Sequence, residues 1–236
     1  MNKLLLLTFA ELPLRPFEIP QFRQVVNDLT AWQHDLLHNH TPEGGEHHRH
    51  SLVLYRSIEG KATIVAINEA VPLLLTLVPL LQAEFGLVQM QFQDVNITLT
   101  ERPRQYSLHQ YLPFNTANYQ AYKDIRSDAM RTVFLEKLLA GHLLGLCQLF
   151  DFFVPEHLTP LIIHKDEKGY HHFPTAKSGK VKHLAFDLKF EVNLDLPPHL
   201  SLGKAGAKGY GILKLLAPKR PRHAYAQQSS STAEVR

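Results

Sequence analysis

The alternation of apolar and polar positions in the first hundred residues predicts strands and helices in turn. Residues 3–9 form an apolar run typical of a strand, and residues 22–37 carry apolar side chains at helical spacing. Two β-rich runs, 52–57 and 62–67, are separated by a short turn that contains Glu-Gly. This arrangement predicts a β-hairpin.

A second helix and a last strand complete this unit. Asn68 is a suitable N-cap for a helix that begins at Glu69, and we expect Pro79 to end or kink that helix because proline has no N–H to donate. Residues 87–99 then supply a strand region. The order β-α-β-β-α-β is that of the ferredoxin-like unit, which many RNA-recognition domains share.

The second part of the chain repeats this plan with weaker signals. The predicted elements are strands at 106–112, 158–164, 184–192 and 209–216 and a long helix at 127–150. The strongest of these signals is the strict alternation of apolar residues over 184–192, which indicates a half-buried strand. We therefore predict an α+β fold made of two tandem ferredoxin-like (RRM-like) domains.

The predicted domains span 1–100 and 101–217, and the charge divides at the same place. Residues 1–100 hold 6 Lys+Arg and 10 Asp+Glu, a balance of −4, whereas residues 101–236 hold 19 and 12, a balance of +7. A basic second part favours a polyanion or a membrane surface as partner. The remaining tail, 218–236, is basic at first and then rich in Gln and Ser, so we expect it to be disordered.

Cysteine content and hydropathy bear on the compartment. The single cysteine, Cys147, sits among leucines of the predicted long helix, which indicates a packing thiol in a reducing compartment and hence a cytoplasmic protein. The apolar run at 4–10 is too short for a secretory signal and is followed at once by Glu11. No uncharged apolar stretch reaches the ~18 residues of a membrane span, so we expect none.

Histidines are concentrated in one short segment. Six occur within 17 residues: His34, His38, His40, His47, His48 and His50. Imidazoles beside a loop can supply a general acid or base near neutral pH, and pairs with one residue between them can also bind zinc or nickel. The segment has no cysteine and no HExxH pattern, and the ββα-metal scaffold of HNH nucleases is not apparent. A polar loop that happens to be rich in histidine is the simpler alternative.

A glycine-rich segment lies at 201–211. Gly203, Gly206, Gly209 and Gly211 allow the backbone to turn with its N–H groups exposed, and Lys204 and Lys208 add positive charge, an arrangement that suits phosphate binding. The segment is neither a P-loop nor a dinucleotide fingerprint, because the spacing differs from both. The structural alternative is a glycine-rich hairpin before the last strand.

Lysines and rings are interleaved between residues 165 and 182. The residues concerned are Lys165, Lys168, Lys177, Lys180, Lys182, Tyr170, His171, His172 and Phe173. Cations beside rings that can stack on bases are typical of single-stranded RNA binding, and the positive second part of the chain favours this interpretation over a solvated hairpin.

Taken together, these features resemble the CRISPR-associated repeat-RNA endoribonucleases of the RAMP superfamily, which cut precursor CRISPR RNA within each repeat. Two stretches carry the resemblance. The C-terminal signature Gly-h-Gly-x5-Gly-h-Gly (h, apolar) is matched by residues 201–211, with Ser201 in place of the first glycine. The other stretch is Leu37-His38-Asn39-His40 after the first helix, together with the hairpin that follows it.

The resemblance implies two ferredoxin-like domains and metal-independent cleavage without a cofactor, in which the 2′-hydroxyl of the RNA attacks the scissile phosphate. It also implies a general acid or base at His38, with His40 as the second choice. Arg49, Arg56 and Lys61 lie downstream of these histidines and are candidates for stabilising the phosphorane. The predicted RNA-binding set is Arg56, Lys177, Lys180, Lys182, Gly203, Lys204, Gly206, Lys208, Gly209 and Gly211.

The resemblance implies precursor CRISPR RNA repeats as the substrate, and a CRISPR effector complex and a second copy of the chain are further candidate partners. Two other functions fit the same residues. One is a non-catalytic protein that holds repeat RNA with its basic second domain. The other is a metal-handling protein that uses the histidine-rich segment.

Overall fold

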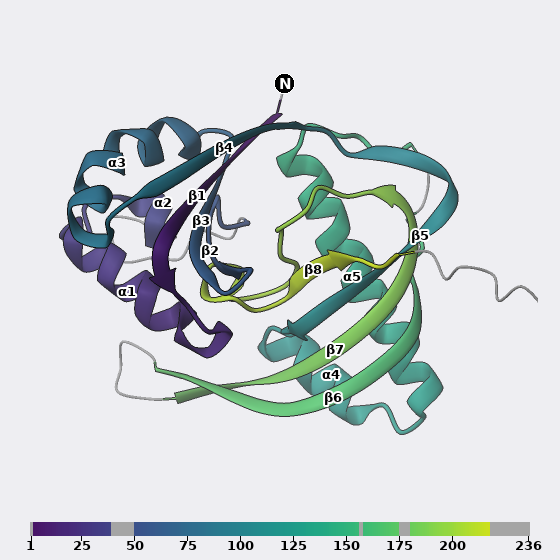
Figure 1. Cartoon of the computed structure of the whole chain (residues 1–236). Coiled ribbons are helices and arrows are strands. Elements are labelled where there is room, and N and C mark those ends of the chain that lie inside the picture. Colours follow the sequence, from purple (N-terminus) through teal and green to yellow (C-terminus); the bar gives the residue numbers. More distant parts are fainter. Residues whose placement is uncertain (1, 39–49, 156–157, 175–179, 218–236) are drawn as a thin grey trace, which may run out of the picture.

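The N-terminal domain is a four-stranded antiparallel sheet with helices on one face (Figure 1). The computed structural model describes residues 2–38, 50–155, 158–174 and 180–217. The elements of this domain are β1 (Asn2–Pro13), η1 (Pro16–Glu18), α1 (Ile19–Leu29), α2 (Asp35–His38), β2 (Val53–Ile58), β3 (Lys61–Ile67), α3 (Ala70–Phe85) and β4 (Val88–Val95). The strand order β2-β3-β1-β4 is ferredoxin-like, as predicted.

The C-terminal domain has the same strand order but lacks the second helix of the ferredoxin-like plan. Its elements are β5 (Thr98–Tyr111), α4 (Thr116–Asp124), α5 (Asp128–Leu149), β6 (Leu161–Pro174), β7 (Lys180–Asp195), η2 (Gly206–Lys208) and β8 (Ile212–Leu215). The sheet order β6-β7-β5-β8 matches that of the first domain. Between β7 and β8, where the ferredoxin-like plan has its second helix, stand only a loop and the single turn η2. The sequence pattern did not indicate α4.

In the N-terminal sheet, both faces of β1, β2 and β3 are buried over most of their length, whereas the edge strand β4 is largely exposed. The four leucines of β1 at positions 4 to 7 are at most 5% exposed, although neighbours along a strand point to opposite faces. One face packs on α1 and α3 through the rings of Phe9, Phe22 and Phe85. The other face, which carries Leu54 and Arg56, contacts the glycine-rich segment of the C-terminal domain. This double burial explains why the sequence of β1 is continuously apolar.

The single helix predicted over 22–37 is interrupted. Thr30 ends α1 by donating its hydroxyl to the carbonyls of Val26 and Asn27, at 3.2 and 3.0 Å. Ala31 and Trp32 then adopt positive φ angles of 49° and 58°, which no helix tolerates. The chain therefore turns before α2.

Two expectations for α3 are also corrected. Glu69, not Asn68, occupies the N-cap position, and the helix continues through Pro79 to Phe85. Asn68 instead has a φ of 47° and joins the domains: its amide donates to the carbonyl of Leu149 at 3.1 Å, while its side-chain oxygen accepts from the Lys3 N–H at 3.0 Å. Asn2 donates in the same way to the Phe150 carbonyl at 2.8 Å. These bonds satisfy carbonyls at the end of α5 that have no partner within the helix.

The long helix α5 is the core helix of the C-terminal domain. Ser127 caps its N-terminus by accepting from the Met130 N–H, and Leu135, Leu139, Leu143, Leu146 and Cys147 are buried. Its length and mean hydropathy of 1.2 would also suffice for a membrane span. The helix carries Asp128, Arg131, Glu136 and Lys137, so it is not an uncharged apolar stretch, and its buried side contributes to the protein core.

We expect Asn68→Ala to lower the free energy of unfolding by about 2 kcal/mol, because it removes the hydrogen bond to α5 and because alanine tolerates a positive φ less well than asparagine does. Asn68→Gly relieves the backbone and should recover part of this loss. Urea unfolding measures both variants, with the exposed Asn96→Ala as control. Equal stability of Asn68→Ala and the control variant would contradict the role of Asn68 in joining the two domains.

Candidate nucleic-acid interface

The glycines of the 201–211 segment are required by the fold. Gly203, Gly209 and Gly211 have φ angles of 79°, 87° and 61°. A Cβ at Gly203 would lie 2.7 Å from the Leu112 carbonyl oxygen, and one at Gly209 would lie 2.9 Å from Ile19 of α1. A side chain at Gly211 would collide with the Leu202 carbonyl. Only glycine therefore fits these three positions.

The predicted phosphate cradle is wrong for Gly209 and Gly211. Their N–H groups donate within the protein, to the carbonyls of Gly206 at 3.2 Å and Gln110 at 3.1 Å. The other two glycines are held by packing: Gly206 is buried against Ser201, and Gly203 lies on the ring of Tyr111. These glycines thus fold the segment tightly onto β5 and α1, with Lys204 exposed and Lys208 half-buried.

Arg56 holds this segment against the N-terminal sheet. It lies on β2 and is 2% exposed. Its guanidinium donates to the carbonyls of His199 (3.2 Å), Gly206 (2.9 Å) and its neighbour Tyr55 (2.8 Å), and to the Ser201 hydroxyl (2.6 Å). Three of these four acceptors belong to the C-terminal domain.

The prediction that Arg56 contacts RNA or the phosphorane is therefore corrected. Its side chain is buried and its donors are engaged with protein acceptors, so it is not available to a ligand. Among the described residues no carboxylate pairs with it, and burial lowers the pKa of Arg56 to about 9. The group is still charged at neutral pH, and the dipoles of these three carbonyls and the Ser201 hydroxyl compensate that charge.

Rings and cations meet where the β6–β7 hairpin approaches the glycine-rich segment. The rings of Phe173 and Tyr210 lie 5.2 Å apart, and the Lys208 ammonium lies 5.3 Å from the centre of the Phe173 ring. His171 contacts the Tyr210 ring at 5.1 Å and lies opposite His183 on the neighbouring strand. We call Phe173, Tyr210, His171, His183 and Lys208 the ring cluster.

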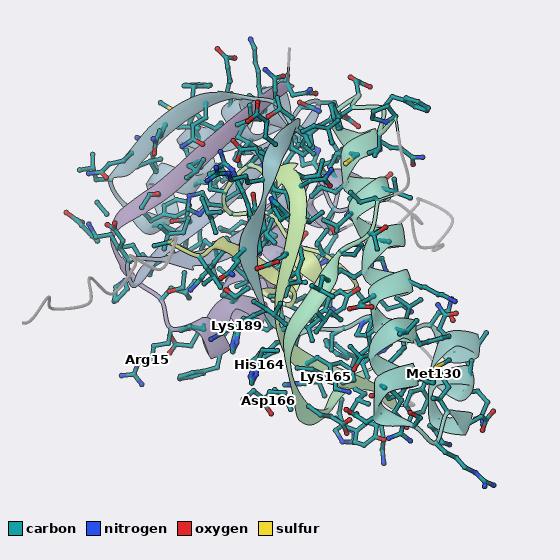
Figure 2. The ribbon with its side chains drawn as sticks, turned by 90° about the vertical axis from the view of Figure 1, so that its right-hand side faces the viewer. Arg15, Met130, His164, Lys165, Asp166 and Lys189 are labelled. Carbon is teal, nitrogen blue, oxygen red and sulfur yellow. The ribbon has the colours of Figure 1, made fainter. Side chains whose placement is uncertain are left out.

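The lysines of the hairpin divide between two faces. Lys165 pairs with Asp128 of α5 at 2.5 Å, so its side chain lies on the face of the sheet that packs against α5. His164 and Lys189 are cross-strand neighbours on the opposite face, and Figure 2 shows them on the side of Arg15 of the N-terminal domain. Lys168 is engaged by Asp166 at 2.6 Å. The face opposite α5 therefore carries the ring cluster and exposed positive charge.

The remaining predicted RNA contacts are placed as follows. Lys182 and Lys204 are exposed, and the backbone of Lys180 opens β7. Lys177 lies outside the described residues. The structure thus brings Lys204 and Lys208 of the glycine-rich segment together with the hairpin that carries Lys182.

The predicted catalytic residues fall mostly in the segment that the structure does not describe. His38 is the last residue of α2, whereas His40 and Arg49 lie outside the described residues. Lys61 begins β3 opposite Ile58, at the turn of the β2–β3 hairpin, and His50 precedes the other end of β2. The length of the strand therefore separates Lys61 from the point where the histidine-rich segment ends.

One group of polar side chains was not indicated by sequence patterns. Tyr111 at the end of β5 and His142 of α5 share a hydrogen bond of 2.6 Å between the phenol oxygen and Nδ1. His50 packs on α5 at Gly145, one turn after His142. The available signal was a histidine followed three residues later by a glycine in an otherwise apolar helix. No group of three or more metal-ligating side chains occurs within the described ranges.

Comparison with known proteins gives the class of this fold. The model of the Cas6b N-terminal domain matches residues 2–105, and that of the Cas6b C-terminal domain matches residues 98–216. The chain therefore belongs to the Cas6b family of CRISPR-associated proteins, as the sequence resemblance indicated.

Solved structures share the fold, and one further protein shares part of the sequence. A crystal structure of Cas6b superimposes with a TM-score of 0.76 at 16% identity, covering 92% of this chain and 100% of the other. A crystal structure described as the CRISPR RNA processing endoribonuclease Cas6b gives 0.68 at 16% identity, with the same coverage. The uncharacterized protein MJ0978 of Methanocaldococcus jannaschii is 27% identical over 127 residues, 53% of this chain and 80% of that protein.

We expect Arg56→Lys to lower the free energy of unfolding by about 3 kcal/mol, because one ammonium cannot reproduce a fork that reaches four acceptors. The matched control is Arg104→Lys, whose exposed pair with Asp195 should contribute less than about 1 kcal/mol. Guanidinium denaturation compares the two. A loss at Arg56 no larger than that at Arg104 would remove the proposed role of this arginine.

Proposed function

We propose that this protein is an endoribonuclease that cuts precursor CRISPR RNA within the repeat. The observation that carries the proposal is the match of both Cas6b domain models, which together span residues 2–216. A solved relative with the same fold is described as a CRISPR RNA processing endoribonuclease. The basic second part of the chain, at +7, supports a polyanionic substrate.

The proposed reaction needs no metal. The 2′-oxygen of the nucleotide before the cut attacks the phosphorus, the bond from phosphorus to the 5′-oxygen breaks, and the products carry a 2′,3′-cyclic phosphate and a 5′-hydroxyl. One group removes the 2′-proton and another protonates the leaving oxygen. We assign these roles to His38 and His40, because an imidazole exchanges protons near neutral pH, and we assign charge stabilisation to Arg49.

The proposed grip on RNA is the face of the C-terminal sheet opposite α5. The ring cluster offers aromatic surfaces on which bases stack, and Lys189 on the same face, with Lys204 and Lys208 of the adjoining glycine-rich segment, offers charge to phosphates. Lys182, which lies opposite His172, projects from the other face of the hairpin. A cytoplasmic location, a CRISPR effector complex and a second copy of the chain remain proposals that accompany this function. Binding of repeat RNA without cleavage is the second candidate, favoured by the same face.

The first test of catalysis is incubation with the cognate repeat RNA in EDTA. We expect cleavage that leaves a 2′,3′-cyclic phosphate, and we expect His38→Ala and His40→Ala to slow it about 100-fold or more, as loss of a general acid or base does. Lys137→Ala, on the exposed side of α5, is the control. Dependence on a divalent metal, or products with a 3′-hydroxyl, would refute the mechanism; tight binding without cleavage would favour the second candidate.

The RNA face predicts a defined salt dependence. Replacing Lys204 with alanine should weaken binding of an uncleavable, 2′-deoxy-substituted repeat RNA and reduce the slope of log K against log salt by about 1, the value for one lost phosphate contact. Tyr210→Leu should weaken binding without changing the slope, because stacking carries no charge. Lys137→Ala on the exposed side of α5 is the control. Slopes that are identical in all three variants would contradict the proposed face.

A further inference from the structure

Three side chains from separate elements meet where the two domains join: Tyr111 from the end of β5, His142 from the middle of α5, and His50 from the residues just before β2. The backbone of Lys204, in the glycine-rich segment, lies beside them. The Lys204 N–H donates to the Leu112 carbonyl at 3.0 Å, which fixes the glycine-rich segment beside Tyr111. Gly203 lies on the other side of the Tyr111 ring. This group is not part of the ring cluster.

The bond between Tyr111 and His142 fixes which nitrogen of the imidazole carries hydrogen. Burial raises the pKa of the Tyr111 phenol and lowers the pKa of His142 to about 4. The phenol is therefore protonated and the imidazole is neutral at pH 7. Among the described residues Nδ1 is the one hydrogen-bond partner of the buried phenol, so the O–H is satisfied by donating to Nδ1 across 2.6 Å. A neutral ring whose Nδ1 accepts a hydrogen bond carries its own hydrogen on Nε2. His142 consequently presents a donor at Nε2, and it is only half-buried.

His50 supports His142 from the N-terminal domain. Its ring hydrogen-bonds to the backbone of His142 and packs on the helix surface at Gly145. A Cβ at residue 145 would lie 2.9 Å from the His50 Nε2, closer than any side chain tolerates. The glycine in α5 thus admits this ring, at a cost of about 1 kcal/mol of helix propensity relative to alanine.

The charges of the group select the kind of ligand. Lys204 is exposed, and its positive charge acts on His142; in the described ranges, no carboxylate does so. A metal cation would be repelled by Lys204 and would find Nδ1 already bonded to the phenol. A neutral N–H donor beside an ammonium instead matches an anion with several acceptor oxygens.

We propose that Nε2 of His142 and Nζ of Lys204 form a subsite for one phosphate of the RNA, with Tyr111 as the positioning residue. The identity of the ligand as RNA rests on the proposed function, whereas the anion preference rests on the geometry alone. His50 immediately follows the segment that carries His40 and Arg49 in the sequence.

The anion preference is tested with inorganic phosphate. We expect saturable shifts of the ring C–H signals of His142 in NMR spectra, with an affinity that falls several-fold in Lys204→Ala and is unchanged in Lys137→Ala. The exposed His109 serves as an internal reference. A His142 signal that does not respond to phosphate would overturn the subsite.

Two substitutions of His142 separate ligand binding from a structural role. His142→Gln keeps a donor near the place of Nε2 and loses the bond to Tyr111, whereas His142→Asn keeps a group near Nδ1 and loses the Nε2 donor. We expect the glutamine variant to retain affinity for the uncleavable repeat RNA and the asparagine variant to lose about tenfold, although asparagine should melt at the higher temperature. The reverse order in affinity, following stability, would assign His142 a structural role only.

Tyr111→Phe tests the positioning role. Removing the hydroxyl releases the imidazole to exchange its hydrogen between the two nitrogens, so phosphate affinity should fall while the ¹⁵N shifts of His142 move toward a mixture of tautomers. Unchanged ¹⁵N shifts would contradict this role. Repeat-RNA cleavage by a protein whose His142 ignores phosphate would refute the subsite and leave the proposed function standing. Phosphate binding at His142 by a protein that does not bind repeat RNA would support the subsite and refute the function.

Discussion

The structure depends on one buried cation. Arg56 crosses from the N-terminal sheet to the carbonyls of His199 and Gly206 and to the Ser201 hydroxyl, and no carboxylate among the described residues neutralises it. Desolvating a guanidinium is costly, so the fold must present several well-placed acceptors together. This requirement fixes the path of the glycine-rich segment, and it accounts for a loop and a single turn where the ferredoxin-like plan has a second helix.

The path of the glycine-rich segment brings together α1, the β6–β7 hairpin and the proposed RNA-binding lysines. The segment that Arg56 holds also carries Lys204 and Lys208, packs on α1 through Gly209, and places Tyr210 against the β6–β7 hairpin. His38 ends α2, which follows α1 after a short turn. It therefore belongs to the N-terminal domain, on which the glycine-rich segment packs. The two domains are therefore joined by buried hydrogen bonds and by the packing of the glycine-rich segment.

Sequence patterns predicted the strands well and the local exceptions poorly. The alternating and continuous apolar runs specify which faces are buried, so β1, β2, β3 and β7 were expected close to their positions. The break after Thr30 and the role of Asn68 depend on positive φ angles and on partners distant in the chain, which periodicity does not encode. Arg56 resembled an RNA contact because sequence shows charge but not burial, and His142 was overlooked because its partner Tyr111 is 31 residues away.

The double burial of the N-terminal sheet has a consequence for synthesis on the ribosome. All strands of this sheet have been translated by Val95, yet the segment that covers its second face, with Ser201 and Gly206, comes about 100 residues later. At the usual translation rate of about 5–20 residues per second, this apolar face stays exposed for about 5–20 s before the glycine-rich segment is synthesised. During that interval the nascent chain presents a binding surface for chaperones, and a protein cut short before residue 199 would expose it permanently.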